Sequence, residues 1–429
     1  MIDKYLINSF KFFFFLIPIG LITGPFIPDL SVTLMALIFI FLSIKKSFWK
    51  KYYNNSVIKF LFLFNAYLIA ISLFSDDILL SLKSSLFYFR FSIFSLAVWY
   101  LMEKSDISYK KNYIIYLFIL FILLSLDAIF QYSFGQNILG FEIVRPERIS
   151  SFFKEQLVLG SYQTRLLVLL MGLYIAFNIF YKNQIILGVI LILTFTSVFL
   201  SGERTSFVLL LLSILLFLPF NKPLLKLLIP FIISLFLILV IAYFDKNMRY
   251  RIFVEPLHQS NLASEKLLDE FKKEKNYYVH EDEVVLIFSK EHTQQYNTAF
   301  KMFLDNPITG LGPKMFRVKC SDKKYYSGLY SCSTHPHNIL MQILSETGII
   351  GMLFYLIIIY FIISQLIRIY IKKNVNINYI KLSCLILFFI NMFPFVPSGN
   401  IFNNWLSIIF YFPLGFYLYS SSMENYEKK

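Results

Sequence analysis

Charged residues are scarce in this chain of 429 residues, since only 15% are Asp, Glu, Lys or Arg. Hydrophobic residues make up 57%, aromatic residues 19%, and the mean hydropathy is +0.64. Too few polar side chains remain to cover the surface of a soluble globule. The composition therefore predicts a membrane protein that crosses the bilayer many times.

Acidic residues are the scarcer charged class, with 26 Asp and Glu against 40 Lys and Arg, which gives a net charge of +14. In a soluble protein this excess would suggest a nucleic-acid partner. Here the basic residues gather in short segments between apolar runs, as expected for the cytoplasmic loops of a membrane protein. We therefore expect no nucleic-acid partner.

Apolar runs of roughly 17 to 25 residues predict about twelve membrane-spanning helices. No small-residue cleavage site follows the first run, so we expect a retained span rather than a removed signal peptide. The predicted spans lie near 10–27, 30–44, 57–74, 82–102, 113–132, 156–180, 184–200, 205–220, 224–244, 337–371, 379–395 and 401–420.

The loop lysines and arginines fall on one side of the membrane if the N-terminus is cytoplasmic. These residues are Lys45, Lys46, Lys50, Lys51, Lys104, Lys110, Lys111, Lys222, Lys226, Arg368, Lys372 and Lys373. The opposite, external side then receives Asp29, Asp76, Asp77, the 133–155 loop, the 201–204 turn, the 245–336 segment and the 394–400 turn. Every candidate functional group is thus predicted to be external.

The chain divides into predicted membrane helices at 1–244, an external loop at 245–336, and further membrane helices with a cytoplasmic tail at 337–429. The loop is too short for a separate enzyme domain. Residues at helical spacing predict one amphipathic helix on the membrane surface, which should stop at Asn306-Pro307. They are Tyr296, Ala299, Phe300 and Phe303.

Cysteine is rare, with three residues in the chain. Cys384 lies in an apolar span and fits a small buried side chain. Cys320 and Cys332 flank a polar stretch on the predicted external side, where an oxidising compartment would permit a disulfide. We expect that bridge, and two unrelated free thiols are the alternative.

Several catalytic motifs are absent. There is no GxSxG elbow, P-loop or HExxH sequence, and no Asp-rich motif of a metal-dependent sugar-nucleotide enzyme. Serine hydrolases, nucleotide-driven pumps and metalloproteases are therefore excluded. His335 and His337 lack the four-residue spacing of a helical zinc motif, and no other ligands complete a set. We predict no metal site.

Basic groups at predicted external span ends remain as candidates. A guanidinium offers a fixed fork of donors suited to phosphate oxygens. A histidine with a pKa near 6.5 can remove a proton from a hydroxyl. The candidates are Arg145, Arg148, Arg204, Arg317 and His337. Exposed loop arginines, a snorkelling Arg204 and a plain interfacial histidine are the alternatives.

Glu346 lies about two and a half turns beyond His337 along an apolar helix, where an ionisable group needs a partner. It either orients a basic residue or is protonated. External arginines would also suit a transporter of an anionic substrate, which is a different class of function. Charges within spans, such as Arg90 and Glu346, are few, which argues against transport.

Four stretches resemble motifs of the O-antigen ligase and polymerase superfamily of bacterial envelope glycosyltransferases. The first has the residues His337-Asn338, Gln342 and Glu346-Thr347-Gly348-Ile349-Ile350-Gly351. The second, Asn306-Pro307-Ile308-Thr309-Gly310-Leu311-Gly312, resembles the family's NPxxGxG stretch. The others are Ser201-Gly202-Glu203-Arg204-Thr205 and Arg148-Ile149-Ser150-Ser151-Phe152, in which Ser151 replaces the family's glycine.

This resemblance implies an all-α, GT-C-like helical bundle in the bacterial inner membrane, with its active site facing the periplasm. It further implies an inverting transfer of a glycan from a polyprenyl diphosphate carrier, without metal or other cofactor, to an acceptor hydroxyl. We favour an O-antigen ligase, whose acceptor is the lipid A core. A polymerase that joins carrier-linked repeat units is the alternative.

Within that resemblance, His337 is the expected activator of the acceptor hydroxyl, while Arg204 and Arg148 bind the diphosphate. Membrane lipid, the glycan donor and the glycan acceptor are the expected partners. Six further residues are expected to bind substrate, although Arg317 belongs to no family motif: Arg145, Arg317, His335, Asn338, Gln342 and Glu346.

Overall fold

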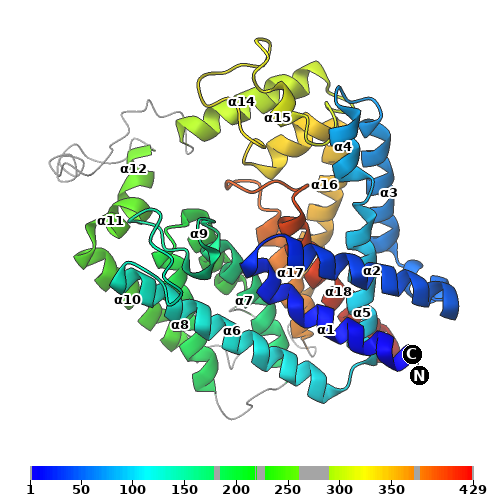
Figure 1. Ribbon diagram of the computed structural model, residues 1–429, viewed down its shortest axis with the longest axis horizontal. Helices are drawn as coiled ribbons and strands as arrows, with labels where there is room; N and C mark the ends of the chain where they lie inside the picture. The colour runs from blue at the N-terminus through cyan, green and yellow to red at the C-terminus, as the bar shows by residue number, and fades with distance from the viewer. Residues whose placement is uncertain are drawn as a thin grey trace.

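The computed structural model of the chain describes residues 2–177, 184–217, 219, 228–259, 289–371 and 377–427 (Figure 1). Across these ranges the chain is helical, with two isolated bridges at 136–142 and 145–148 and no β-strand. The predicted all-α polytopic bundle is thereby confirmed. Four of the predicted cytoplasmic lysines, Lys222, Lys226, Lys372 and Lys373, lie outside the described residues.

Each of the twelve predicted spans coincides with one helix, or in one case with a broken pair. The helices are α1 (Ile2–Thr23), α2 (Phe26–Lys46), α3 (Ser56–Ser72), the pair α4 (Ile78–Ser85) and α5 (Phe89–Lys104), α6 (Ile107–Phe134), α7 (Leu159–Ala176), α8 (Gln184–Leu200), α9 (Arg204–Phe217), α10 (Leu228–Phe244), α16 (Ile339–Ile371), α17 (Tyr379–Asn391) and α18 (Asn404–Glu427).

Not every one of these helices is long enough to cross a bilayer alone. In the described part of the chain, seven are long and apolar enough, counting α4 with α5 as one span. An eighth results if α10 and the helical stretch after it form one span bent by 114°. Helices α3, α8, α9 and α17 are apolar but shorter. The count of twelve spans stays a prediction.

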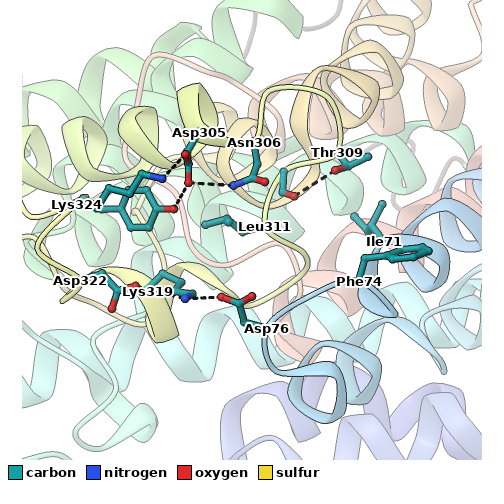
Figure 2. A pocket seen from close by; sticks show the side chains of 12 residues that line it. Ile71, Phe74, Asp76, Asp305, Asn306, Thr309, Leu311, Lys319, Asp322 and Lys324 are labelled. Carbon is teal, nitrogen blue, oxygen red and sulfur yellow. Dashed lines mark hydrogen bonds and ion pairs between the residues drawn. The ribbon is translucent and has the colours of Figure 1, made fainter.

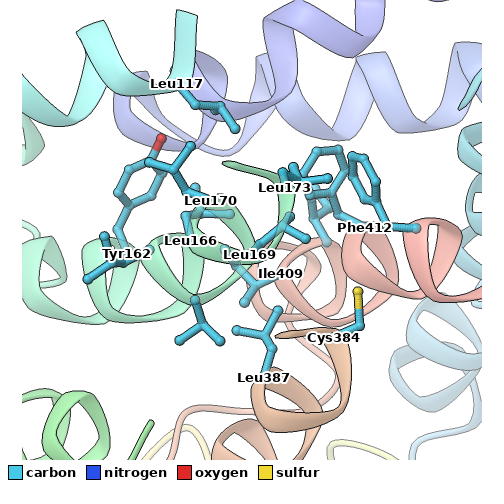
Figure 3. Packing of buried hydrophobic residues seen from close by; sticks show 14 of the residues in the cluster. Leu117, Tyr162, Leu166, Leu169, Leu170, Leu173, Cys384, Leu387, Ile409 and Phe412 are labelled. Atoms are coloured by element: carbon cyan, nitrogen blue, oxygen red, sulfur yellow. The ribbon is translucent and has the colours of Figure 1, made fainter. Parts of the chain in front are cut away.

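Helix α7 lies at the centre of the bundle and is buried along nearly its whole length. Figure 3 shows Leu166, Leu169 and Leu170 of this helix between Leu117 of α6 and Leu387 of α17. Gly172 lets α7 and α17 approach closely, because a Cβ there would lie 2.1 Å from Ser383 Oγ. Small residues at such crossings are typical of helix packing in membranes.

The predicted external segments contact one another, although they are far apart in the sequence. Ile149 N donates to Leu200 O at 3.1 Å, and Arg251 Nε donates to Gly202 O at 3.3 Å. Ser398 N donates to His337 O at 2.8 Å. The 133–155 loop, the 201–204 turn and the 245–336 segment therefore meet on one face, and the 394–400 turn joins the last of these.

Residues predicted to be cytoplasmic also meet one another. Lys51 pairs with Glu103, and Lys110 Nζ donates to Tyr419 Oη at 2.9 Å. Lys381 Nζ lies 2.9 Å from Glu424 Oε2. The predicted external and cytoplasmic segments thus form two separate sets of contacts, and which set faces the cytoplasm stays a prediction from the loop charges.

The described parts of the 245–336 segment contain α11 (Lys246–Arg249), α12 (Glu255–Gln259), α14 (Lys290–Asp305) and α15 (Phe316–Lys319). Helix α14 is the predicted amphipathic helix, and it ends at Asn306 as expected. Its buried face packs against α16, as the neighbouring positions of α14 and α16 in Figure 1 show. Tyr296 and Ala299 lie in that face, whereas Phe300 is exposed.

Candidate functional site

A kink in α16 joins two of the sequence motifs. Gly348 has a left-handed φ of +62° inside the helix, and a Cβ there would lie 2.4 Å from Ile308 O. Gly310, with φ +67°, approaches the same kink, because its Cβ would lie 2.4 Å from Thr347 N. Only glycine fits such close backbone contacts. The glycines of both motifs therefore serve the packing of the 306–312 stretch against α16.

Backbone hydrogen bonds complete this junction. Leu311 N donates to Ser345 O at 3.0 Å, and Ile349 N donates to Pro307 O at 2.8 Å. Thr347 O, released from the helix by the kink, accepts from Tyr67 Oη of α3 at 2.6 Å. The stretch thus supplies the partners that a broken helix requires in an apolar environment.

Three polar residues of the His337 motif bind other protein groups. Asn338 accepts from Leu340 N at 2.9 Å as the N-cap of α16, while its amide donates to Pro394 O at 2.8 Å. Gln342 donates to Glu346 Oε2 at 2.9 Å and to Asn400 Oδ1 at 2.8 Å. Glu346 also accepts from Phe316 N at 3.0 Å.

These contacts explain why polar residues occur in an apolar helix. Gln342 and Glu346 are fully buried, and Asn338 is nearly so. The three side chains join the start of α16 to the 394–400 turn and to α15. Their predicted role in substrate binding stays a prediction, and the arrangement gives each of them a positioning role.

Three histidines meet at the start of α16. The ring centroid of His337 lies 4.0 Å from that of His335 and 5.8 Å from that of His292, which belongs to α14. His335 is buried, and its Nε2 donates to Ser398 O at 3.2 Å, because a carbonyl can only accept. His337 is partly exposed, and its Nε2 lies 3.0 Å from Ser333 Oγ.

The surroundings keep these histidines neutral. Burial lowers the pKa of His337, and it lowers the pKa of His335 to about 3, to which the neighbouring His337 contributes. Burial, then His337, then Arg204 lower the pKa of His292 to about 4. Imidazoles that remain unprotonated at neutral pH are suited to accept a proton.

The Ser201-Gly202-Glu203-Arg204 turn is fixed by its middle residues. Gly202 has φ +63°, and a Cβ there would lie 2.2 Å from Glu147 O. Glu203 accepts from Gly160 N at 2.7 Å and from Ser161 N at 3.0 Å, which caps the start of α7 with a carboxylate. Arg204 follows at the first position of α9, and its Nη2 lies 3.5 Å from Glu255 Oε1.

Ser151 occupies a position at which the family motif has glycine, and its contacts explain how a serine fits there. Its φ is +53°, a left-handed conformation that favours glycine. Gln131 Oε1 accepts from Ser151 N at 2.6 Å, and Ser151 Oγ donates to the carboxylate of buried Asp127. A serine therefore occupies the glycine position with its side chain bound to α6, and the loop that carries Arg148 remains in place.

Arg148, Arg204 and Arg251 form an arginine cluster. Burial lowers the pKa of Arg148, Glu203 raises it, and neighbouring Arg251 lowers it. Arg251 Nη1 lies 2.9 Å from Glu255 Oε2, the carboxylate that also pairs with Arg204. Three guanidinium groups beside Glu203 and Glu255 leave a local excess of one positive charge.

One N–H donor of the arginine cluster, on Arg148, lacks an acceptor among the described residues. Arg148 Nη2 donates to Leu157 O at 3.1 Å, but its buried Nε has no partner among the described residues. A buried donor without a partner costs free energy unless a ligand or water binds it. An anion bound at this cluster would supply that acceptor.

The structure brings some predicted site residues together and leaves others apart. Arg204 belongs to the arginine cluster, and its charge reaches His292 beside His337. Arg145 is exposed, its carbonyl oxygen accepts from Arg148 N at 2.8 Å, and its charge contributes to lowering the pKa of Arg148. Arg317 is exposed at α15, on the side of His335.

Sequence reasoning missed Arg251, Glu255 and His292. Arg251 and Glu255 lie four residues apart on consecutive helical turns, which is an ion-pair spacing. Ser289 caps α14 three residues before His292. Neither signal points to a site until the fold places both beside motif residues.

Two further observations concern ligands. In the described ranges, no group of three or more His, Cys, Asp or Glu side chains is placed to hold a metal ion. An apolar cavity of about 110 Å³ lies among α3, α16, α17 and α18. Ser398, Gly399 and the buried Arg165 of α7 also line it, and Ser398 O accepts from His335 of the histidine cluster.

The fold and site define a multi-pass membrane protein with histidines and arginines gathered on one face. A protein-family model described as O-antigen ligase matches residues 187–356, which include Arg204, Arg251, His292 and His337. This match over part of the chain supports the resemblance to the O-antigen ligase and polymerase superfamily, whose members are glycosyltransferase-like enzymes. A comparison with curated proteins finds no match.

Proposed function

We propose that this protein is an O-antigen ligase-like enzyme of the bacterial inner membrane. It transfers a glycan from a polyprenyl diphosphate carrier to an acceptor hydroxyl of the lipid A core, on the periplasmic face. The observation that carries the proposal is the neutral, partly exposed His337, which lies beside His292, a histidine whose pKa is lowered in part by Arg204 of the arginine cluster.

The proposed reaction needs a base and a site for a leaving anion. His337 accepts the proton of the acceptor hydroxyl as that oxygen attacks the anomeric carbon. The bond between this carbon and the diphosphate oxygen breaks from the opposite side, so the configuration inverts. The diphosphate leaves with the bonding electron pair, and Arg148, Arg204 and Arg251 stabilise its charge.

The apolar cavity supports the carrier as donor. It is lined by side chains of the membrane helices and ends at Ser398 beside the histidine cluster. The cavity is smaller than the site of a whole ligand, so it would hold only a short part of the carrier's hydrocarbon chain near the polar face. No divalent ion is required for the proposed step, because guanidinium groups supply the positive charge.

The carrier-lipid profile of a deletion strain tests the acceptor. Loss of a ligase leaves long glycan polymers on the carrier, whereas loss of a polymerase leaves single repeat units. We expect long polymers, and complementation should restore their transfer to lipid A core. Accumulation of single units would overturn the ligase assignment and identify a polymerase. An unchanged profile would contradict both.

A further inference from the structure

A second cavity lies outside the histidine and arginine groups, on the predicted external side. Its volume is about 540 Å³, which is within the usual size of a small-molecule site. One wall is the turn after α3, with Ile71, Phe74 and Asp76. The other wall is the stretch from the end of α14 through the loop between Cys320 and Cys332, as Figure 2 shows.

The charged groups of this cavity are already paired. Lys319 binds Asp76 across the cavity and lies 3.4 Å from Asp322. Lys324 and the Tyr325 hydroxyl bind Asp305 (Figure 2). Three carboxylates face two ammonium groups, so the cavity is close to neutral with a slight negative excess. A diphosphate would meet like charge here, unlike at the arginine cluster.

The same cavity combines hydrogen-bonding groups with an exposed aromatic ring. Phe74 is 90% exposed, and Leu311 lies beside the polar groups. Carboxylate and amide oxygens of Asp76 and Asn306 can accept from hydroxyls, and the lysines can donate. A sugar ring presents hydroxyls at its edge and an apolar C–H face. Such a ligand uses both kinds of surface without requiring net charge.

The cavity is joined to the candidate site by covalent and hydrogen-bonded structure. Leu311 of its wall donates to Ser345 O of α16 at 3.0 Å. Cys332 closes the disulfide loop that forms another wall, and His335 follows three residues later. Ser345 lies six residues after the first residue of α16, roughly 9 Å along the helix, and His337 lies just before that helix begins, so a glycan bound at His337 could extend a more distant sugar toward this cavity.

We propose that this glycan cavity binds an uncharged sugar residue of the glycan substrate, away from the diphosphate. The inference rests on the proposed function, because that function supplies a glycan as substrate. Either the carrier-linked donor glycan or the acceptor core oligosaccharide provides the sugar. The chemistry is the same for both, and the experiment separates them.

Binding of free oligosaccharides to the full-length protein in lipid nanodiscs tests the proposal. The two probes are glycan released from the carrier by mild acid and core oligosaccharide released from lipid A, each titrated by calorimetry. We expect one probe to bind, and Phe74→Ala and Asp76→Asn to raise its Kd about tenfold or more, which corresponds to roughly 1.4 kcal/mol. The probe that responds identifies the source of the sugar.

Leu79→Ala is the matched control, since Leu79 is exposed nearby at the start of α4 but does not line the cavity. Equal Kd values for wild type, Phe74→Ala and Asp76→Asn, or no binding of either probe, would overturn the glycan cavity. Equal weakening in Leu79→Ala would do so too, because it would indicate a general effect at the membrane surface.

Glycan transfer by the same preparation is measured separately. Transfer that persists while both cavity variants bind like wild type overturns this inference and leaves the proposed function standing. If the protein binds a probe in a way that depends on Phe74 but transfers no glycan, the glycan cavity stands and the proposed function is overturned. The two failures are therefore distinguishable.

Discussion

His337 is held in an unusual backbone conformation. Its φ is +52°, a left-handed value that costs energy for a residue with a side chain. The neighbouring 394–400 turn secures it through the bond from Ser398 N to His337 O. Strain of this kind at a partly exposed imidazole agrees with a functional position. The first prediction concerns this side chain.

We expect His337→Ala to reduce glycan transfer about a hundredfold or more, because the acceptor hydroxyl loses its base. Transfer from purified carrier-linked glycan in vitro is the measurement. His292→Ala is the matched variant, since it removes a neighbouring ring from the same cluster and should have the smaller effect. Full transfer by His337→Ala protein that inserts normally would exclude the proposed base.

Arg204→Lys is predicted to weaken use of the donor far more than conservation of charge suggests. Lysine keeps the positive charge but loses the planar fork that binds two phosphate oxygens. Rates at limiting donor concentration should fall, and Arg251→Lys should behave similarly. Arg249→Lys is the control, because Arg249 lies two residues before Arg251. Equal rates for wild type and Arg204→Lys would remove this residue from the diphosphate site.

The buried histidines predict a loss of stability in acid. Folding lowers the pKa of His292 to about 4 and that of His335 to about 3, from an ordinary value of 6.5. Below pH 6.5 the unfolded chain takes up protons that the folded protein refuses, so the free energy of unfolding falls.

The thermal midpoint of detergent-solubilised protein should therefore be highest above pH 6.5 and decline steadily as the pH falls toward 4. A His292→Gln variant should show a shallower decline over the same window. An identical pH dependence in the variant would mean that His292 does not contribute to it.

At the scale of elements, the junction between α16 and the 306–312 stretch determines where the candidate base lies. The kink at Gly348 interrupts α16 about three turns after His337, and Glu346 ties the helix to α15. The predicted amphipathic helix α14 adds His292 from the opposite side. A distortion of this junction would displace groups that never contact it directly.

Gly348→Ala should therefore strongly reduce the amount of folded protein. The added Cβ would lie 2.4 Å from Ile308 O, and the left-handed φ adds strain. Gly135→Ala is the matched control, because Gly135 has φ +80° but no atom within 4 Å of an added Cβ. It should cost only about 1 kcal/mol. Equal thermal stability of the two variants would show that the close contact is unimportant.

At the scale of the whole molecule, the disulfide reports which side of the membrane the glycan cavity faces. Cys320 and Cys332 form a disulfide, whereas Cys384 is buried and free. Such bonds persist in an oxidising compartment such as the periplasm. The disulfide therefore provides a test of orientation that does not depend on activity.

Mass spectrometry of protein that is alkylated, without reduction, after unfolding should find label on Cys384 alone. Prior reduction should add label at Cys320 and Cys332. In a strain that lacks periplasmic disulfide formation, all three should be labelled. Label on Cys320 and Cys332 in unreduced protein from an oxidising periplasm would contradict both the bond and the predicted side.

The sequence was sufficient to predict the membrane helices, because a run of apolar residues in a bilayer can form few structures other than a helix. It also found His337, Arg148 and Arg204 through motif likeness. It could not find Arg251 or His292, since each depends on contacts between segments far apart in the chain. It predicted Asn338, Gln342 and Glu346 as substrate ligands, which stays a prediction, but sequence alone could not show the buried hydrogen bonds that these side chains make within the protein.

The glycine junction has a consequence for exchanging parts between related proteins. Gly310 packs against the backbone of α16, and Gly348 packs against the backbone of the 306–312 stretch. This stretch and the first turns of α16 therefore have to be exchanged together. A chimera that imports a foreign loop up to residue 336 would separate the two glycine-bearing partners. A graft that continues through Gly351 keeps them together. Exchanges of this segment between related proteins should accordingly succeed only when the crossover point lies beyond the kink.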